Sequence, residues 1–174
     1  FATVSQMVEF STMISTTNKT KNKSIFSRIK TVDENYPLFG EVGYEPSGAF
    51  EKLQTTENTI LVNENIFKNL NLELNDKIKV QDKLFTVIGI VKSVPDIGGA
   101  FVFGDFALAG KQTLELLKLN NLGSFLNYEY KVRFNEGDNP KTLSKKIEQL
   151  FKDEKKVILR YHEKSDGPLK RIID

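Results

Sequence analysis

The segment ILVNENIFKNLNLELNDKIKVQDKLFTVIGIVK, residues 60–92, carries the clearest structural pattern in the sequence. Its opening run ILV is apolar, and Ile66, Phe67 and Leu70 follow at the spacing of one helix face. Asn63 precedes this helix and suits its N-cap, because the side-chain oxygen can accept an otherwise unpaired backbone N–H. The pattern predicts a strand followed by a short helix.

The second half of the segment predicts strands joined by tight turns. Asn75 and Asp76 form one turn signal, and the polar residues 81–83 form another. The run LFTVIGIV, residues 84–91, is apolar at both alternations, which is typical of a strand buried on both faces or closed into a small barrel. Gly89 within it indicates a bulge or a bend. We therefore expect the core of a compact β-rich module here.

The two ends of the chain predict a different unit. Residues 4–15 and 23–32 are strand-like and are joined by a polar turn, so they predict a long β-hairpin. Near the other end, residues 125–135 alternate as a strand. Asn139 and Pro140 then begin a helix as N-cap and first residue.

Together these patterns predict an α+β fold with a split β-α-β lobe and an inserted, small, barrel-like β-rich lobe. We place the first lobe in residues 1–44 and 124–174 and the inserted lobe in residues 45–123. The first lobe is expected to be incomplete at the N-terminus, because the layout requires another strand and helix before Val4.

Composition excludes several functional classes. The chain has 25 basic and 23 acidic residues, a balance that argues against a dedicated nucleic-acid-binding protein. It has no cysteine, so disulfides, cysteine-based metal sites and cysteine nucleophiles are excluded. No window approaches the roughly 20 apolar residues of a membrane helix. Because the first residue is Phe1, we expect the sequence to be part of a longer protein or a processed chain.

Catalytic patterns are weak throughout. His162 is the single histidine and lies in the charged stretch YHEKSD, where a surface position is expected. Glu129 and Glu136 do not form an evident carboxylate pair. The sequence contains neither a cluster of metal ligands nor a phosphate-binding loop. We therefore predict a non-catalytic protein without a cofactor or a metal.

One apolar loop is the candidate binding site. Its large side chains are Ile97, Phe101, Phe103 and Phe106, next to a Gly-Gly pair. They are expected either to form a surface for a hydrophobic cargo or a partner, or to fill the core between the lobes. The sequence leaves both alternatives open.

The motifs resemble the MacB-like periplasmic core domain of ABC transporter permeases, the FtsX/LolC/MacB superfamily, and within it the YbbP-type subgroup. The segment 60–92, the loop PDIGGAF and the strand beginning NYEY resemble their counterparts in that family, in the same order. The N-terminal half of the resemblance is carried by Val8, Phe10, Met13, Val32, Asp33, Tyr36, Pro37, Leu38 and Gly40. Asn75 departs from the family, which often has glycine there, so this asparagine is expected in a left-handed conformation.

The resemblance implies a porter-like split lobe and a sabre-like inserted lobe on the outer side of the bacterial inner membrane, tethered by helical stalks. It also implies mechanotransmission without chemistry in this domain, since a separate cytoplasmic ATPase subunit hydrolyses ATP. The implied partners are that ATPase, a second permease domain and a periplasmic protein, but no nucleic acid. The alternative is a free-standing soluble module that binds a hydrophobic ligand. The sequence specifies neither the cargo nor the direction of transport.

Overall fold

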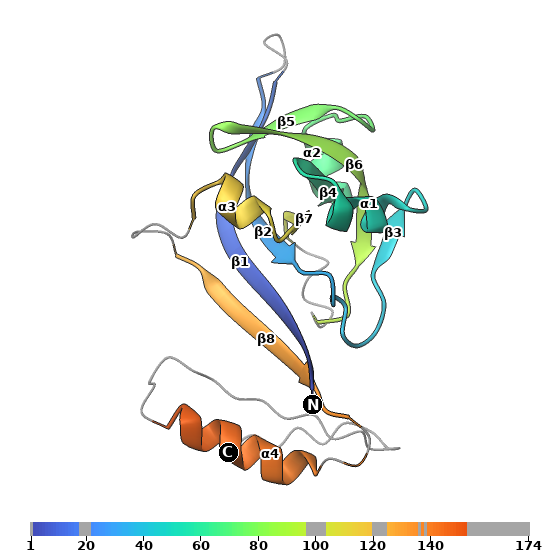
Figure 1. Ribbon diagram of the computed structural model, residues 1–174. Helices are drawn as coiled ribbons and strands as arrows, with labels where there is room; N and C mark the ends of the chain where they lie inside the picture. Colours follow the sequence, from blue (N-terminus) through green and yellow to red (C-terminus); the bar gives the residue numbers. More distant parts are fainter. Residues whose placement is uncertain are drawn as a thin grey trace. The chain divides into compact units, whose positions relative to one another are not determined.

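The structure, a computed structural model, describes residues 2–17, 22–96, 104–119, 125–135, 137 and 139–152. The chain forms two compact units, residues 2–133 and residues 134–174 together with Phe1. The first unit contains the sheet and three short helices, and the described part of the second contains one helix (Figure 1).

The strands are β1 (Thr3–Thr16), β2 (Ser24–Val32), β3 (Gly43–Glu45), β4 (Thr59–Asn63), β5 (Lys77–Val80), β6 (Lys83–Ser93), β7 (Phe106–Gly110) and β8 (Asn127–Arg133). The helices are α1 (Ala49–Thr55), α2 (Glu64–Asn69), α3 (Thr113–Leu116) and α4 (Pro140–Leu150). The predicted α+β class is confirmed.

The sheet closes into a barrel. Hydrogen-bonded neighbours run in the order β2-β7-β4-β6-β5-β1, and β1 pairs with β2 to close the ring. Strands β3 and β8 lie outside the ring, paired with β6 and β1 respectively. Closure leaves the ring strands without a free edge, which removes the backbone groups that would otherwise remain unpaired.

The predicted N-terminal hairpin is confirmed. Its strands β1 and β2 are antiparallel, with Met7 opposite Val32 and Ser15 opposite Ser24. β1 also pairs with β5, and β2 pairs in parallel with β7. Strands from both predicted lobes therefore build one ring, and the division of the chain at residues 44/45 and 123/124 stays a prediction.

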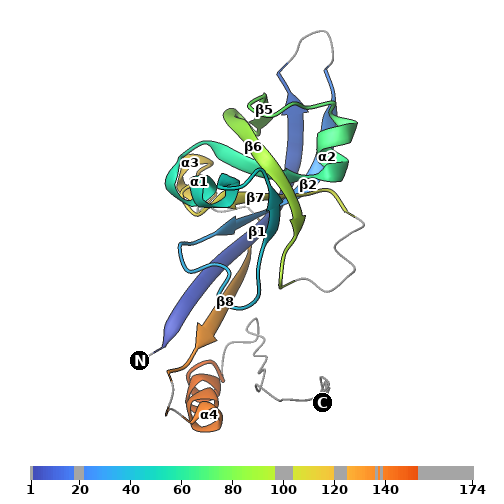
Figure 2. The same ribbon diagram turned by 90° about the vertical axis from the view of Figure 1, so that its right-hand side faces the viewer.

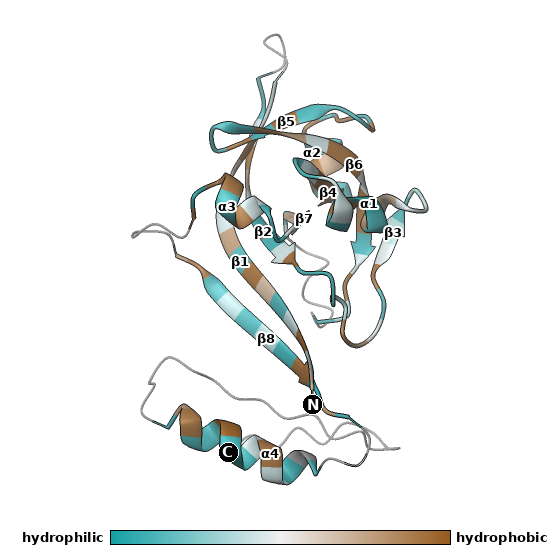
Figure 3. Cartoon of the chain, viewed as in Figure 1, coloured by the Kyte–Doolittle hydropathy of each residue, from teal (hydrophilic) through white to brown (hydrophobic). Residues whose placement is uncertain are grey.

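Two apolar clusters explain why the barrel strands are apolar at both alternations. Phe85 and Val87 of β6 point into the barrel interior, where Phe10 and Ile14 of the hairpin meet them. Ile88 and Val91 of the same strand belong to the second cluster, which lies under α1. In Figure 3 the hydrophobic colour accordingly recurs along β4 and β6.

Gly89 marks a bulge, as predicted. The pairing of β4 with β6 shifts there, so that Ile60 is opposite Val87 and Leu61 is opposite Gly89. A Cβ at Gly89 would lie 2.5 Å from the carbonyl oxygen of Glu45 and 2.8 Å from Cδ2 of Leu61. The lack of a side chain therefore allows the β3–α1 segment to pack directly on β6 (Figure 2).

The predicted short helix after β4 is confirmed as α2. Asn63 is its N-cap, and the side-chain oxygen accepts a hydrogen bond from the backbone N–H of Ile66 at 3.1 Å. The Nδ2 of the same side chain donates to the carbonyl oxygen of Gly104 at 2.7 Å. Asn63 thus joins the helix start to the segment that leads into β7.

Replacing Asn63 by alanine should lower the free energy of unfolding by about 1–2 kcal/mol, since it removes the cap and a second hydrogen bond. Asn63→Asp is the matched control, because it keeps the capping oxygen and loses only the donor to Gly104. Urea unfolding of both variants separates the two contributions. Equal stability of Asn63→Ala and wild type would contradict the assignment.

The second unit contains α4, which begins as predicted. The Asn139 side chain accepts hydrogen bonds from the backbone N–H groups of Lys141 and Thr142, and Pro140 occupies the first turn. Lys145 and Lys146 are exposed, consistent with a solvated face. His162 and Glu136 lie outside the described residues. Among the described helices, none is long and apolar enough to cross a membrane.

Candidate functional site

Of the four residues predicted to form the apolar binding site, the structure describes Phe106. Phe106 begins β7 and is 2% exposed in the cluster under α1, where it packs as a core residue. Ile97, Phe101 and Phe103 lie outside the described residues. The cargo surface therefore stays a prediction for those three residues.

The residue that precedes this loop is held by a buried ion cluster. The Asp96 side chain is 1% exposed, and its Oδ2 lies 2.7 Å from Nζ of Lys30 on β2. Its Oδ1 accepts a hydrogen bond from the hydroxyl of Tyr36 at 2.9 Å. Nζ of Lys131 on β8 lies 3.6 Å from the same Oδ1. Both carboxylate oxygens thus have partners from separate segments.

Lys30 is the second buried charge of this group. Its side chain is 4% exposed, and Nζ also lies 3.8 Å from Oε2 of Glu129 on β8. We refer to Lys30, Tyr36, Asp96, Glu129 and Lys131 as the Asp96 cluster. Two ammonium groups face two carboxylates, so its formal charges balance, as buried ions require.

The cluster controls the protonation of its central groups. Burial acts to raise the pKa of Asp96, but the hydrogen bond and charge of Lys30, the charge of Lys131 and the Tyr36 hydroxyl outweigh it and hold this pKa below its ordinary value. Burial first, and then the charge of Asp96 and the hydrogen bond to it, raise the pKa of Tyr36. Asp96 is therefore a carboxylate and Tyr36 a neutral donor at neutral pH.

The far end of the loop is also anchored. Gly104 accepts the hydrogen bond from Asn63, and the backbone N–H of Arg28 donates to the carbonyl oxygen of Asp105 at 3.1 Å. The described residues on both sides of this segment, Asp96 and Gly104, thus contact the barrel strands. Sequence reasoning missed the cluster, because the strand SIFSRIKTV also carries Arg28 and nothing in its pattern marks Lys30 as buried.

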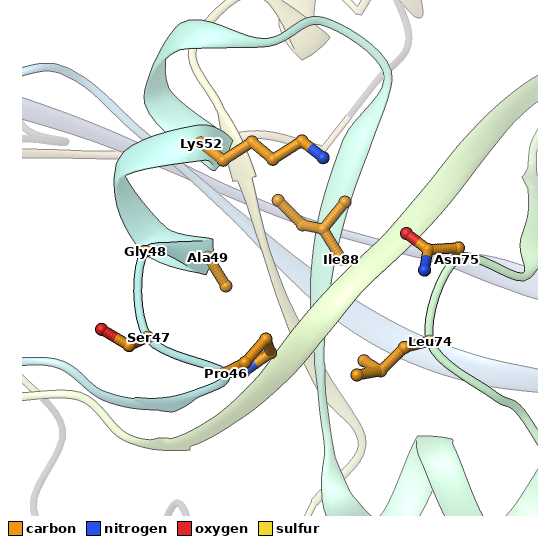
Figure 4. Close-up of a pocket in the computed structure, with 8 residues that line it drawn as sticks. All are labelled: Pro46, Ser47, Gly48, Ala49, Lys52, Leu74, Asn75 and Ile88. Carbon is orange, nitrogen blue, oxygen red and sulfur yellow. The ribbon is translucent and has the colours of Figure 1, made fainter.

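A shallow groove of about 240 Å³ lies elsewhere on the first unit (Figure 4). Pro46, which follows β3, and Ala49, the first residue of α1, face Leu74 and Ile88 across it, with Lys52 at its rim. The lining is apolar apart from Ser47, Lys52 and Asn75. Asn75 adopts the predicted left-handed conformation, with φ 72°. The groove offers apolar contact but no arrangement of acid, base and nucleophile.

The described residues contain no group of three potential metal ligands close enough to hold an ion. The buried ions are also fully engaged with one another. The chemistry available at the Asp96 cluster is therefore charge pairing that positions strands.

Acid should reveal the contribution of Asp96 to stability. Because the folded-state pKa lies below the unfolded value, this contribution is present above about pH 4 and is lost as the pH falls through the folded pKa. We expect urea stability to fall between pH 5 and pH 2 and to fall less steeply in Asp96→Asn. Identical pH profiles of the two proteins would contradict this prediction.

Comparison with known proteins agrees with this architecture. Residues 1–150 match the family of MacB-like periplasmic core domains. Over 115 residues, 63% of this chain, the sequence is 28% identical to the uncharacterized ABC transporter permease YbbP of Escherichia coli (strain K12). The chain spans 13% of the length of that relative.

Solved structures show the same fold. The periplasmic region of MacB from Actinobacillus actinomycetemcomitans matches with a TM-score of 0.58 and 16% identity, over 87% of this chain and 66% of that one. The extracellular domain of the noncanonic ABC-type transporter YknZ from Gram-positive bacteria matches with a TM-score of 0.57 and 9% identity, over 85% and 74%. With the match over residues 1–150, these findings show that the chain belongs to the family of MacB-like periplasmic core domains.

Proposed function

We propose that this chain is the non-catalytic extracytoplasmic domain of an ABC transporter permease. The observation that carries the proposal is the family match over residues 1–150, together with the resemblance to YbbP. The protein would reside in the inner membrane, with this domain on the periplasmic or extracellular side.

The mechanism we propose is mechanical. A separate cytoplasmic ATPase subunit hydrolyses ATP, and transmembrane motion reaches this domain through the chain at its two ends. The domain acts with a second permease domain, in the same chain or in a dimer, and with a periplasmic protein. The result is export or extraction of a hydrophobic or lipid-linked cargo. The closed barrel is compatible with this role, because its ring strands are hydrogen-bonded to one another and leave no long unpaired edge.

The location is tested on the whole gene product in cells. The 174 residues contain no cysteine, so Ser47→Cys introduces a single exposed thiol in this domain. It should react with a membrane-impermeant maleimide added outside spheroplasts, and the protein should fractionate with the inner membrane. Ser27→Cys is the matched control, because this position is buried and should react only after denaturation. A soluble product would overturn the proposal and favour the free-standing binding module.

We also propose that Ile97, Phe101 and Phe103 form an apolar surface that contacts the cargo. Phe101→Ser and Phe103→Ser should then change the free energy of unfolding by less than about 0.5 kcal/mol, as exposed substitutions do. Urea unfolding of the 174-residue chain measures this. A loss of about 3 kcal/mol or more would show core packing instead.

A further inference from the structure

Strand β8 is attached to the barrel in an unusual way. It pairs with β1, outside the ring, and none of its residues is buried. Both views show it running alongside the N-terminal half of β1 (Figures 1 and 2). One of its faces carries Tyr128 and Tyr130, which are both exposed. Apolar burial therefore contributes little to holding this strand, and its attachment depends on the ladder with β1 and on polar side-chain contacts.

The opposite face of β8 meets the Asp96 cluster. Glu129 is opposite Met7 and Lys131 is opposite Ser5 in the ladder, so both side chains share the face that carries Lys30. Glu129 contacts Lys30 at 3.8 Å, and Lys131 contacts Asp96 at 3.6 Å. The same cluster thus joins β2 and β8 to Asp96, which lies three residues after the end of β6.

The two halves of the cluster differ in exposure. The Lys30–Asp96 pair is almost fully buried, whereas the Lys131 and Glu129 side chains are 24% and 45% exposed. A buried, hydrogen-bonded ion pair is expensive to separate, while a partly exposed pair separates at small cost because water replaces the lost contact. The inner half therefore behaves as a fixed anchor and the outer half as a releasable contact.

We propose that the Asp96 cluster is a joint that couples displacement of β8 to β2 and to Asp96, which directly precedes residues 97–103. This inference rests on the proposed function, because β8 leads directly into residues 134–174, one of the two ends through which motion would arrive. When β8 is held in place, Lys131 and Glu129 fix its face against Asp96 and Lys30. While these contacts hold, a displacement of β8 is passed on to Lys30 and Asp96. When they separate, β8 moves alone and the inner pair remains with the barrel.

Hydrogen exchange on the 174-residue chain tests the joint itself. In Lys131→Met, amides of residues 127–133 should exchange about threefold faster, as expected from the loss of one partly exposed ion pair. Asp96→Asn should accelerate the same amides about tenfold, because it weakens a buried charged contact as well. Exchange in β4 and β7 should be unchanged in Lys131→Met.

Arg133→Met is the matched control, since it removes a cation from the same strand outside the cluster and should leave exchange in β8 at the wild-type rate. Unchanged exchange of β8 in Lys131→Met, or the same acceleration in Arg133→Met, would overturn the joint. The Lys131 side chain is partly exposed, so this variant gives a result even where Asp96→Asn does not fold.

Coupling is tested in the whole membrane protein with its ATPase. Addition of a non-hydrolysable ATP analogue should alter exchange of residues 127–133 and 28–36 together in wild type, but only of residues 127–133 in Lys131→Met. If exchange of residues 28–36 still changes with that of residues 127–133 in Lys131→Met, the proposed coupling is wrong. The thiol-labelling experiment reports separately on the proposed function, so a failed joint with a correctly placed domain contradicts only this inference.

Discussion

Replacing Lys30 by methionine should lower the free energy of unfolding by about 3–5 kcal/mol, among the largest losses expected from one substitution in this chain. Nζ of Lys30 lies 2.7 Å from Oδ2 of Asp96, and both side chains are buried. Removing the ammonium leaves the Asp96 carboxylate buried with only the Tyr36 hydroxyl and the more distant Lys131. A buried charge without its main partner costs much more than the intact pair contributes. Chemical denaturation at pH 7 measures the loss.

The double variant Lys30→Met/Asp96→Asn should recover part of this loss, because it removes the buried charge together with its partner. Lys68→Met provides the surface comparison. Lys68 forms a 3.1 Å ion pair with Glu64, but the Lys68 side chain is 74% exposed. The free energy of unfolding of Lys68→Met should therefore stay close to the wild-type value. If Lys30→Met proved no more harmful than Lys68→Met, the energetic role of the Asp96 cluster would be wrong.

Replacing Gly89 by alanine should lower the free energy of unfolding by about 3 kcal/mol. This is the upper end of the losses that usually follow when a side chain is enlarged in a packed core. The added Cβ would stand 2.5 Å from the carbonyl oxygen of Glu45, 2.8 Å from Leu61 Cδ2 and 3.0 Å from Ala49 Cβ. The first of these is a backbone atom and cannot rotate away. The β3–α1 segment must therefore move off β6, which opens the second apolar cluster.

Gly48→Ala separates this steric effect from backbone strain. Gly48 has φ +82°, yet a Cβ there would meet no atom within 4 Å, so only the left-handed conformation is penalised, by about 1–2 kcal/mol. Thermal unfolding of both variants should place Gly89→Ala clearly below Gly48→Ala. The reverse order would show that β6 relaxes around the new methyl group.

Local features were readable from the sequence. Asn63 as the cap of α2, Asn139 and Pro140 at the start of α4, Asn75 in a left-handed turn and the N-terminal hairpin all appear as predicted. Each depends on residues within a few positions of one another, or on the alternation of side chains along one strand. The bulge at Gly89 was also predictable, because a glycine inside an apolar strand has few other structural roles.

The Asp96 cluster was not predictable in the same way. Lys30 and Asp96 are 66 positions apart, and neither carries a local pattern that names the other. Phe106 likewise could belong to a loop surface or to the core, and only the pairing of β7 with β2 and β4 buries it. The family match indicates a fold, but the placement of such pairs depends on the particular side chains present.

The amino-acid sequence thus specifies α2, the start of α4, the turn at Asn75 and the N-terminal hairpin, since capping, turn conformation and side-chain alternation act over a few residues. Closure of the ring through β1–β5 and β2–β7, and the burial of Lys30 against Asp96, depend on the tertiary structure. The physical reason is that both arise between segments far apart in the chain. Backbone edges and buried charges are satisfied by whichever partners the assembled fold brings within hydrogen-bonding distance.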